Sequence, residues 1–323
     1  MAVKRTVLRW IGKLDVIQVE PFLAFGNGIE IFTKGRVISA YKQSRPSAKN
    51  NWLKNILAAI RRYSGKGISG VKVDISVGDS KFLVETNADG VFQCVFNDFQ
   101  PEVDHILFRI LDESEGLHTR NRTLKIDRFH SAVGVISDVD DTILISHATD
   151  IGKKFWLSIS KNAYTRRPLP GVSEFYRKLT QEGDHPIFYV SSSDWSLFDL
   201  IKDFLAYRSI PMGPILLKDK HINLRNIWKS GGGSHQHKKE KIMLLLEMFP
   251  KMAFYLIGDS GQHDPEIYEE IVQEFPHRIK AVFIRIVNPS HEEKERRERL
   301  DKFSNFHFVK NTQEAMEVAL QYV

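Results

Sequence analysis

The chain of 323 residues contains a single cysteine, Cys94. One thiol cannot form a disulfide within the chain, and it excludes a zinc cluster built from thiolates. A protein without disulfides suits a reducing compartment, so we expect a cytoplasmic location. The N-terminal segment has no continuous apolar core of the kind that a signal peptide needs, so we expect none.

Long hydrophobic runs are also lacking. No stretch approaches the roughly 20 apolar residues that a membrane-spanning helix requires, so any membrane contact is expected to be peripheral. Hydrophobic residues make up 42% and charged residues 27% of the chain, which favours packed globular domains over disorder. The formal net charge of +6 suits an anionic partner, such as a phosphate substrate, an anionic membrane or nucleic acid. It fits an ordinary basic surface equally well.

The first part of the chain is predicted to be β-rich, because apolar and polar residues alternate there. Strands are expected at residues 71–77, 92–96, 103–111 and 124–126, and a turn at 87–90. One helix is expected between the strands, because four apolar residues share one helical face: Trp52, Ile56, Ile60 and Tyr63. We predict a small β-sandwich-like domain over residues 1–128.

From residue 129 to residue 323, short apolar runs alternate with helical patterns. Buried strands are expected at residues 132–136, 187–190, 215–217, 254–257 and 281–284. Apolar stripes at helical spacing predict helices around residues 172–179, 197–204 and 242–249. This alternation predicts an α/β domain with a parallel sheet and helices on both faces. Because such sheets place their sites beyond the carboxyl ends of the strands, the residues after each apolar run are the candidates.

The first predicted strand is followed by an acidic motif, which reads SDVDDT at residues 137–142. Three carboxylates this close together repel one another unless a positive charge lies among them. Acidic turns without function are also common. The position directly after a buried strand favours a functional role for Asp138 and Asp140.

Polar residues also follow the second strand and begin a later helix. Ser191 and Ser192 carry hydroxyls that suit phosphate oxygens, although Ser193 or Asp194 can equally be a plain helix N-cap. Lys238 lies at the start of a predicted helix, where a positive charge opposes the helix dipole. Such a lysine fits either a phosphate site or a solvated basic face.

The fourth strand is followed by GDSGQHD at residues 258–264, which supplies Asp259 and Asp264. Opposite Asp138 and Asp140, these two acids would form an oxygen-rich pocket. Hard oxygen ligands without thiolates select Mg²⁺ over Zn²⁺. His263 has no matching histidine–carboxylate motif nearby, so zinc is disfavoured.

These four motifs, in this order and each at a strand end, resemble the four motifs of the HAD (haloacid dehalogenase) superfamily. From residue 132 to about 288 the chain is similar to the catalytic domain of the actin-patch phosphatidate phosphatase family, and more distantly to the lipins. The resemblance rests on VISDVDDTI at 135–143, NAYTRRPLPG at 162–171, FYVSSSDW at 188–195, GPILL at 213–217 and LIGDSGQHDPEIY at 256–268. Asp194 departs from the family pattern, in which proline is expected, and could shift substrate preference.

The resemblance implies a Mg²⁺-dependent phosphatidate phosphatase with a HAD-like Rossmannoid sheet. Asp138 would attack phosphorus and form an aspartyl-phosphate. Asp140 would act as general acid and then as general base. Ser191 and Lys238 would hold the phosphoryl oxygens.

The same resemblance implies the other site residues. The metal ligands would come from Asp138, Asp140, Asp259 and Asp264, with Asp264 acting through a water or holding Lys238. Substrate contacts are expected at Thr142, Ser192, Arg166 and Arg167.

Asp140 argues against two related classes of enzyme. The related ATPases carry threonine at this position, and the dehalogenases lack the second aspartate. The segment 143–167 is too short for a substantial cap domain, so the site is expected to be open, as suits a membrane-borne substrate. Its residues 153–157, KKFWL, either touch an anionic lipid surface or pack onto the domain.

The expected partner is phosphatidate or another phospholipid at an anionic membrane surface, and no nucleic acid is expected. Two alternatives stay open: a phosphatase for another phosphomonoester, soluble or in nucleic acid, and a non-catalytic membrane adaptor.

Overall fold

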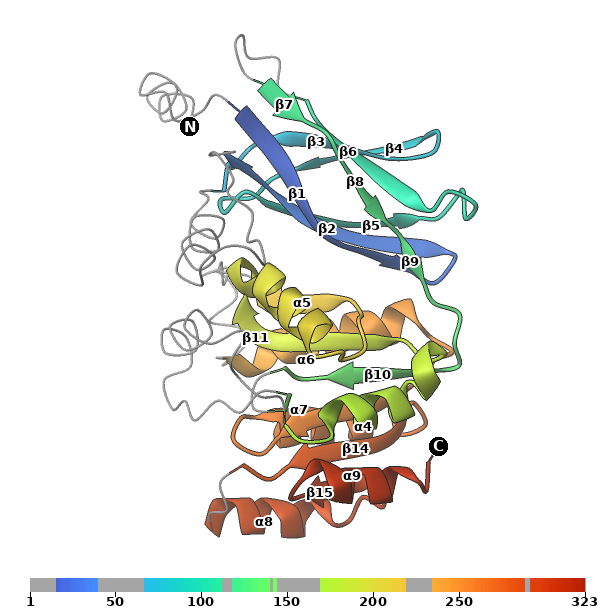
Figure 1. Cartoon of the computed structure of the whole chain (residues 1–323), viewed down its shortest axis with the longest axis vertical. Helices are drawn as coiled ribbons and strands as arrows, with labels where there is room; N and C mark the ends of the chain where they lie inside the picture. Colours follow the sequence, from blue (N-terminus) through green and yellow to red (C-terminus); the bar gives the residue numbers. More distant parts are fainter. Residues whose placement is uncertain are drawn as a thin grey trace. The chain divides into compact units, whose positions relative to one another are not determined.

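The computed structural model describes residues 16–39, 67–111, 118–139, 142–143, 169–218, 234–287 and 291–322. The chain divides into two compact units, Met1–His130 and Ser131–Val323 (Figure 1). The sequence prediction placed the boundary after residue 128. Several predicted features lie outside the described residues: the helix at 52–63, the segment 153–157, Asp140, Arg166 and Arg167.

The first unit is built from two β-sheets. The five-stranded sheet has the order β5-β2-β1-β7, with β9 also paired to β1, and the four-stranded sheet has the order β4-β3-β6-β8. The strands of the first sheet are β1 (Val16–Gly26), β2 (Glu30–Ser39), β5 (Val91–Asn97), β7 (His118–Arg120) and β9 (Asp127–Arg128). Those of the second are β3 (Lys72–Val77), β4 (Ser80–Glu85), β6 (His105–Ile110) and β8 (Arg122–Lys125).

One apolar core joins the two sheets of this unit. Val19 and Val37 from the first sheet lie in the same buried cluster as Val73, Ile75 and Phe108 from the second. The alternation in residues 71–77 therefore reports a buried face, since Val73 and Ile75 are inside and Lys72 is exposed. In its described residues the first unit is β-rich, as predicted, while its assignment as a β-sandwich stays a prediction.

The second unit is α/β, with a six-stranded sheet in the order β12-β11-β10-β13-β14-β15, in which every pairing is parallel. Its strands are β10 (Val133–Ser137), β11 (Ile187–Asp194), β12 (Ile215–Lys218), β13 (Ala253–Asp259), β14 (Ile279–Arg285) and β15 (Phe306–Val309). Its helices are α4 (Val172–Leu179), α5 (Phe198–Tyr207), α6 (Ser234–Met248), α7 (Asp264–Glu274), α8 (His291–Leu300) and α9 (Thr312–Ala319).

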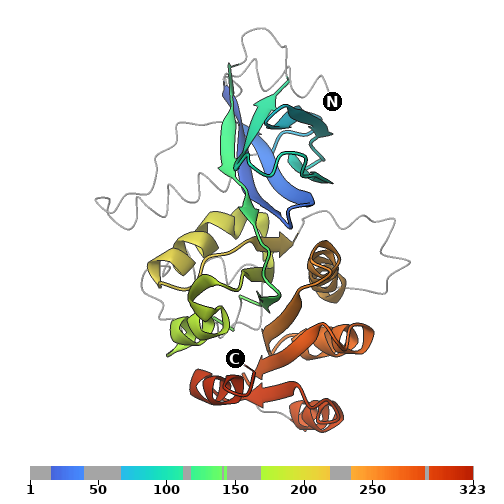
Figure 2. The same ribbon diagram turned by 90° about the vertical axis from the view of Figure 1, so that its right-hand side faces the viewer.

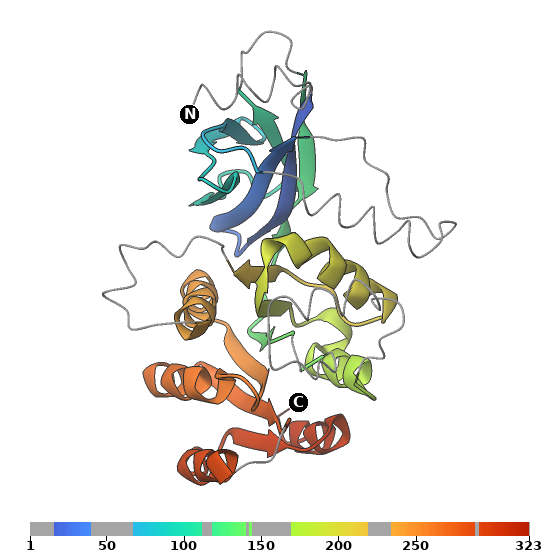
Figure 3. The ribbon, with the colours of Figure 1, turned by 90° about the vertical axis from the view of Figure 1, so that its left-hand side faces the viewer.

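Helices cover both faces of this sheet. Figures 2 and 3 show α4, α5 and α9 on one face and α6, α7 and α8 on the other. Strands that are covered on both sides are apolar throughout, as in β13, where residues 254–257 are all buried. The predicted parallel sheet with helices on both faces is confirmed, while its HAD-like assignment stays a prediction.

The strand order reverses at the centre of the sheet. The chain leaves β10 toward β11 on one side, whereas the neighbouring strand β13 leads to β14 on the other. Ligand sites of open parallel sheets lie at such a switch point, beyond the carboxyl ends of the strands. The ends of β10 and β13 are therefore where a site is expected.

The helix cap proposed for Ser193 or Asp194 stays a prediction. Strand β11 continues to Asp194, which pairs with Lys218 of β12, and a 3₁₀ turn at Trp195–Leu197 follows. Helix α5 starts only at Phe198, and its N-cap residue Leu197 makes no side-chain cap. Pairing with β12 keeps the backbone extended through the serines. Within the described residues, no helix has the length and apolar character needed to cross a membrane.

Candidate active site

Two buried aspartates stand at the ends of the two central strands. Asp138 directly follows β10, Asp259 is the last residue of β13, and both are fully buried. Parallel pairing of Ser137 with Ile257 brings these strand ends to the same edge of the sheet. Asp138 also donates its backbone N–H to the Ile257 carbonyl at 2.8 Å. The register of two strands thus determines where the candidate nucleophile lies.

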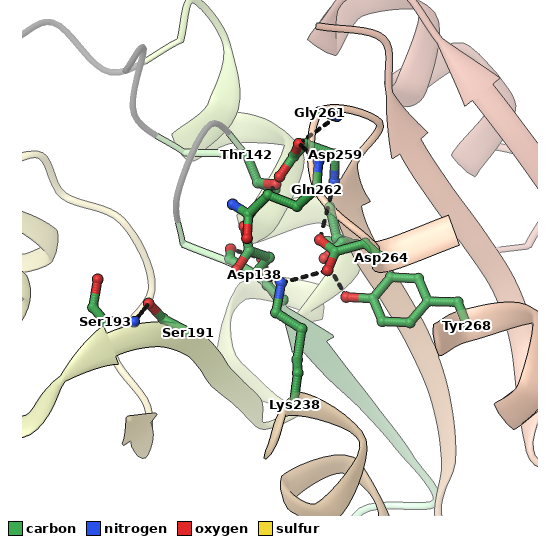
Figure 4. A network of polar contacts seen from close by, with 12 residues as sticks. Asp138, Thr142, Ser191, Ser193, Lys238, Asp259, Gly261, Gln262, Asp264 and Tyr268 are labelled. Carbon is green, nitrogen blue, oxygen red and sulfur yellow. Dashed lines mark hydrogen bonds and ion pairs between the residues drawn. The ribbon is translucent and has the colours of Figure 1, made fainter. Parts of the chain in front are cut away.

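A buried lysine connects the acidic groups (Figure 4). Lys238, in the N-terminal part of α6, places its Nζ 2.9 Å from Oδ1 of Asp138. The same Nζ donates a short hydrogen bond to Oδ1 of Asp264, the first residue of α7. The other oxygen of Asp264, Oδ2, accepts the backbone N–H of Asp259 at 3.2 Å. Asp264 therefore orients both the lysine and the end of β13.

The loop after β13 is shaped around two carboxylates. Oδ1 of Asp259 accepts the backbone N–H groups of Gly261 and Gln262 at 2.7 and 3.0 Å. A Cβ atom at Gly258 would lie 2.5 Å from Oδ2 of Asp264, a distance that no real contact tolerates. Only glycine at position 258 lets Asp264 pack against this strand.

The electrostatics of the cluster favour a charged lysine. Burial lowers the pKa of the Lys238 ammonium, but the charges of Asp138 and Asp264 and their hydrogen bonds outweigh it, so the pKa lies above its ordinary value. Lys238 is therefore positive at neutral pH.

The same cluster fits a magnesium ion. Carboxylate oxygens of Asp138, Asp259 and Asp264 lie within 4.8 Å of one another, and all three residues are buried. Three carboxylates face one ammonium in this network, so negative charge is in excess. Hard oxygen ligands with excess negative charge match the preference of Mg²⁺.

The remaining predicted residues divide into two groups. Thr142 belongs to the cluster, because its Oγ1 donates to Oδ2 of Asp138 at 3.3 Å. Ser191 and Ser192 lie near the end of β11, the neighbour of β10 on the side away from β13. Ser191 is buried, and its Oγ accepts the backbone N–H of Ser193 at 3.0 Å (Figure 4). Asp138 thus lies between the serines and the Asp259–Asp264 pair.

Three residues whose hydroxyls form hydrogen bonds around Asp138 were not predicted from the sequence. They are Ser137, Tyr176 and Tyr268, all buried. Ser137 and Tyr268 stand inside stretches that carry the family resemblance, and Tyr176 is part of the apolar stripe that predicts α4. The motifs and the apolar stripe were the signals available in the sequence for these residues. Neither kind of signal shows which groups the hydroxyls contact.

Comparison with known proteins finds a family match within the α/β unit. Residues 133–286 match the family described as phosphatidate phosphatase APP1, catalytic domain. The chain is 34% identical over 167 residues to phosphatidate phosphatase APP1 of Saccharomyces cerevisiae. This alignment covers 50% of this chain and 28% of the yeast protein. It is 25% identical over 219 residues to an uncharacterized protein of Schizosaccharomyces pombe, covering 64% of this chain and 35% of that protein.

The fold and the site define an α/β unit with an acidic centre at its switch point. Residues 133–286 match the APP1 catalytic-domain family, so the resemblance predicted from the motifs is confirmed. The chain spans about a third or less of the length of these curated relatives, 28% and 35%. The solved structure of a carbohydrate acetylesterase from Xanthomonas citri aligns with 87% of this chain and with 74% of the esterase chain. The TM-score of 0.23 and the identity of 9% are too low to indicate a shared fold.

Proposed function

We propose that the α/β unit is a Mg²⁺-dependent phosphatidate phosphatase of the HAD type, in which Asp138 is the nucleophile. The observation that carries the proposal is the buried network of Asp138, Lys238 and Asp264 at the switch point of a parallel sheet. It lies inside the segment that matches the APP1 catalytic-domain family.

Lys238 and Thr142 contact the carboxylate of the proposed nucleophile, Asp138. The Lys238 ammonium lies 2.9 Å from one oxygen of the Asp138 carboxylate, and Thr142 donates to the other oxygen, which orients the carboxylate. Attack by a carboxylate oxygen forms an O–P bond and breaks the bond between phosphorus and the lipid oxygen. Asp140, two residues further along, would give the leaving oxygen a proton and later take one from the water that hydrolyses the aspartyl-phosphate.

Positive charge is the second requirement, because phosphoryl transfer depends mainly on positioning and charge neutralisation. Lys238 supplies one fixed ammonium beside Asp138, and Ser191 offers a hydroxyl from β11. Mg²⁺, when bound, would neutralise phosphoryl oxygens. Asp138 and Asp259 are the residues that would hold it, with Asp140, and Asp264 would hold Lys238 and the Asp259 backbone in place.

The lipid substrate is the finer part of the proposal. The yeast relative is named a phosphatidate phosphatase, and a net charge of +6 suits an anionic lipid surface. We therefore place the protein on the cytoplasmic side of an anionic membrane as a peripheral enzyme, where it converts phosphatidate to diacylglycerol and phosphate.

A substrate panel tests the proposal. Phosphate release is measured from detergent micelles of phosphatidate, lysophosphatidate and diacylglycerol pyrophosphate, and from soluble phosphomonoesters, with Mg²⁺ or with EDTA. Phosphatidate should be hydrolysed fastest, and only with Mg²⁺. Faster turnover of a soluble or nucleic-acid phosphate would leave the phosphatase but refute the lipid substrate, and no turnover of any substrate would favour an adaptor.

The nucleophile is tested separately by Asp138→Asn. It should lower kcat at least about a thousandfold, because the amide cannot attack phosphorus. A variant that retains full turnover would refute the aspartyl-phosphate mechanism.

A further inference from the structure

Two buried tyrosines reach the end of β10 from opposite faces of the sheet. Tyr176 is on α4 and Tyr268 is on α7, and these helices cover different faces (Figures 2 and 3). Both side chains are at most 1% exposed. Neither contacts solvent, and the proposed chemistry assigns neither a role.

Tyr268 acts on the backbone N–H of Asp138. Its hydroxyl donates to the Ile257 carbonyl at 2.9 Å, and the same carbonyl accepts the N–H of Asp138 at 2.8 Å. A carbonyl oxygen has two lone pairs and can accept both. Tyr268 therefore holds in place the acceptor that fixes the amide of the nucleophile.

Tyr176 acts on the backbone carbonyl of the same residue through Ser137. The Ser137 hydroxyl donates to the Asp138 carbonyl at 2.7 Å and lies 2.6 Å from the Tyr176 hydroxyl. A serine hydroxyl has one proton, and a carbonyl can only accept. Because that proton is used on Asp138, Tyr176 must donate to Ser137. The result is a directed chain from α4 to the nucleophile.

We propose that Tyr176, through Ser137, and Tyr268, through Ile257, are positioning residues that fix the peptide backbone of Asp138 from both sides. The inference rests on the proposed function, since it assumes that Asp138 attacks phosphorus. A nucleophile must approach within a few tenths of an ångström of the right place, and a misplacement of about 1 Å costs about a hundredfold in rate. Two buried hydroxyls on two packed helices supply that rigidity where β10 has already ended.

The charge state of both hydroxyls supports permanent donation. Burial raises the pKa of Tyr268, and the carboxylates of Asp264, Asp138 and Asp259 raise it further. Burial also raises the pKa of Tyr176, more than its hydrogen bond with Ser137 lowers it. Both tyrosines keep their protons at neutral pH, so phenylalanine at either position removes one donor and little else.

The competing explanation is that these are ordinary buried tyrosines whose hydroxyls need any acceptor. The same unit contains two matched controls. Tyr189 donates to the Pro211 carbonyl at 2.6 Å, and Tyr255 donates to the Tyr322 carbonyl at 2.7 Å. Both are as buried as the proposed pair, and neither hydroxyl bonds to a group around Asp138.

The experiment compares Tyr176→Phe and Tyr268→Phe with Tyr189→Phe and Tyr255→Phe in the full chain. All four variants should lose similar thermal stability, since each loses one hydroxyl bond. The first two should each lower kcat about tenfold with KM unchanged, and about a hundredfold together, while the controls stay within about twofold of the wild type. Equal kcat in all four variants would overturn the inference.

Ser137 tests the direction of the chain. Ser137→Ala should lower kcat as much as Tyr176→Phe does, and the two changes together should cost no more than either alone, because both break the same path. Ser137→Thr keeps the hydroxyl and should restore most of the rate. Full additivity of the two losses would show that Tyr176 does not act through Ser137.

A second measurement separates this inference from the proposed function. Beryllium fluoride with Mg²⁺ mimics an acyl phosphate on an aspartate, and its binding raises Tm without any turnover. A wild-type protein with no Tm shift and no turnover would refute the proposed function itself. A normal wild-type shift that is undiminished in Tyr176→Phe and Tyr268→Phe would refute only the positioning role.

Discussion

Each of the two units contains a fully buried lysine, and the two lysines have different surroundings. Lys34 in β2 is 1% exposed, and its Nζ donates to the side-chain amide of Gln93 in β5 at 2.9 Å. Lys238 is 2% exposed and lies between the carboxylates of Asp138 and Asp264. Lys34 links two neighbouring strands, whereas Lys238 links a helix to the end of β10 and the start of α7.

The charged pairs of the two units differ in the same sense. In the β-rich unit, Arg36 pairs with Glu20 at 2.7 Å and Arg128 with Asp98 at 2.6 Å, one cation for each carboxylate. At the centre of the α/β unit three carboxylates cluster around one lysine. In a balanced pair the two charges offset each other, while this cluster carries an excess of negative charge. The imbalance thus distinguishes the candidate site from the paired charges of the β-rich unit.

The largest effects should come from exchanging the two lysines for methionine. Lys238→Met removes the cation from the carboxylates, so kcat should fall about a hundredfold to a thousandfold. Stability should fall by about 3 kcal/mol, and Mg²⁺ should recover part of the loss. Lys34→Met should cost about 1 kcal/mol and leave kcat unchanged. Thermal unfolding with and without Mg²⁺, together with phosphate release, measures both; a large loss of kcat in Lys34→Met would contradict the comparison.

The next largest difference between the two units is expected from replacing one glycine in each, Gly258 and Gly35, by alanine. In Gly258→Ala the new Cβ meets Asp264, so the anchor of Lys238 moves and kcat should fall about tenfold to a hundredfold. In Gly35→Ala the Cβ lies 2.7 Å from the Phe92 ring and 2.9 Å from the Glu20 carbonyl, which should cost about 1–3 kcal/mol of stability.

Gly35→Ala should leave kcat intact at temperatures at which the protein stays folded. Steady-state kinetics and denaturant titration distinguish the two variants. The comparison fails if Gly258→Ala loses only stability.

A balanced pair should matter for stability alone. Arg128 binds both carboxylate oxygens of Asp98, which is buried, at 2.6 and 3.0 Å. Asp98→Asn should therefore destabilise the β-rich unit by about 2 kcal/mol, because Arg128 loses its counter-charge. Hydrogen-exchange mass spectrometry should show faster exchange in β5 and β9. Unchanged exchange there, or a loss of kcat, would contradict the prediction.

The smallest effect concerns a titration away from the site. His307 in β15 lies 2.7 Å from the Tyr322 hydroxyl, and burial lowers its pKa below the usual 6.5. The unfolded chain then binds the proton at higher pH than the folded chain. The contribution of His307 to stability is complete above about pH 6.5. It is lost as the pH falls through the lower pKa that His307 has in the folded chain.

Denaturant titration between pH 7.5 and pH 5 measures this loss. In His307→Gln the decline below pH 6.5 should be shallower than in the wild type, and the pH profile of kcat should not change. A decline of the same steepness in both proteins would refute the role of His307.

Sequence reasoning located the elements whose apolar pattern was clean. The stripe Val172, Phe175, Tyr176 and Leu179 is entirely buried in α4, as predicted. Strand β2 was missed because it is buried on both faces yet carries Lys34 and Arg36 at buried positions. A pattern read as apolar against polar cannot recognise a strand whose buried side chains are charged.

The candidate site shows the same division. Asp138, Asp259 and Lys238 were found from the sequence, because each follows an apolar run or begins a helix, and the parallel sheet brings those ends together. The N-cap at Ser193 or Asp194 stays a prediction, because β11 continues to Asp194 and a 3₁₀ turn lies between Asp194 and α5. The roles of all the predicted site residues stay predictions, and Asp140, Arg166 and Arg167 lie outside the described residues.

The sequence by itself determined the class of the second unit and the identity of its acidic residues, because strand ends and motif spacing are local properties of the chain. Only the tertiary structure decided what surrounds Asp138. Tyr176 and Tyr268 are 92 positions apart along the printed sequence and come from helices on opposite faces, so no local pattern links them to one peptide group. Their hydroxyls bond to Ser137 and Ile257, the two groups that hydrogen-bond the Asp138 backbone, because the register of β10 and β13 and the packing of α4 and α7 bring them there.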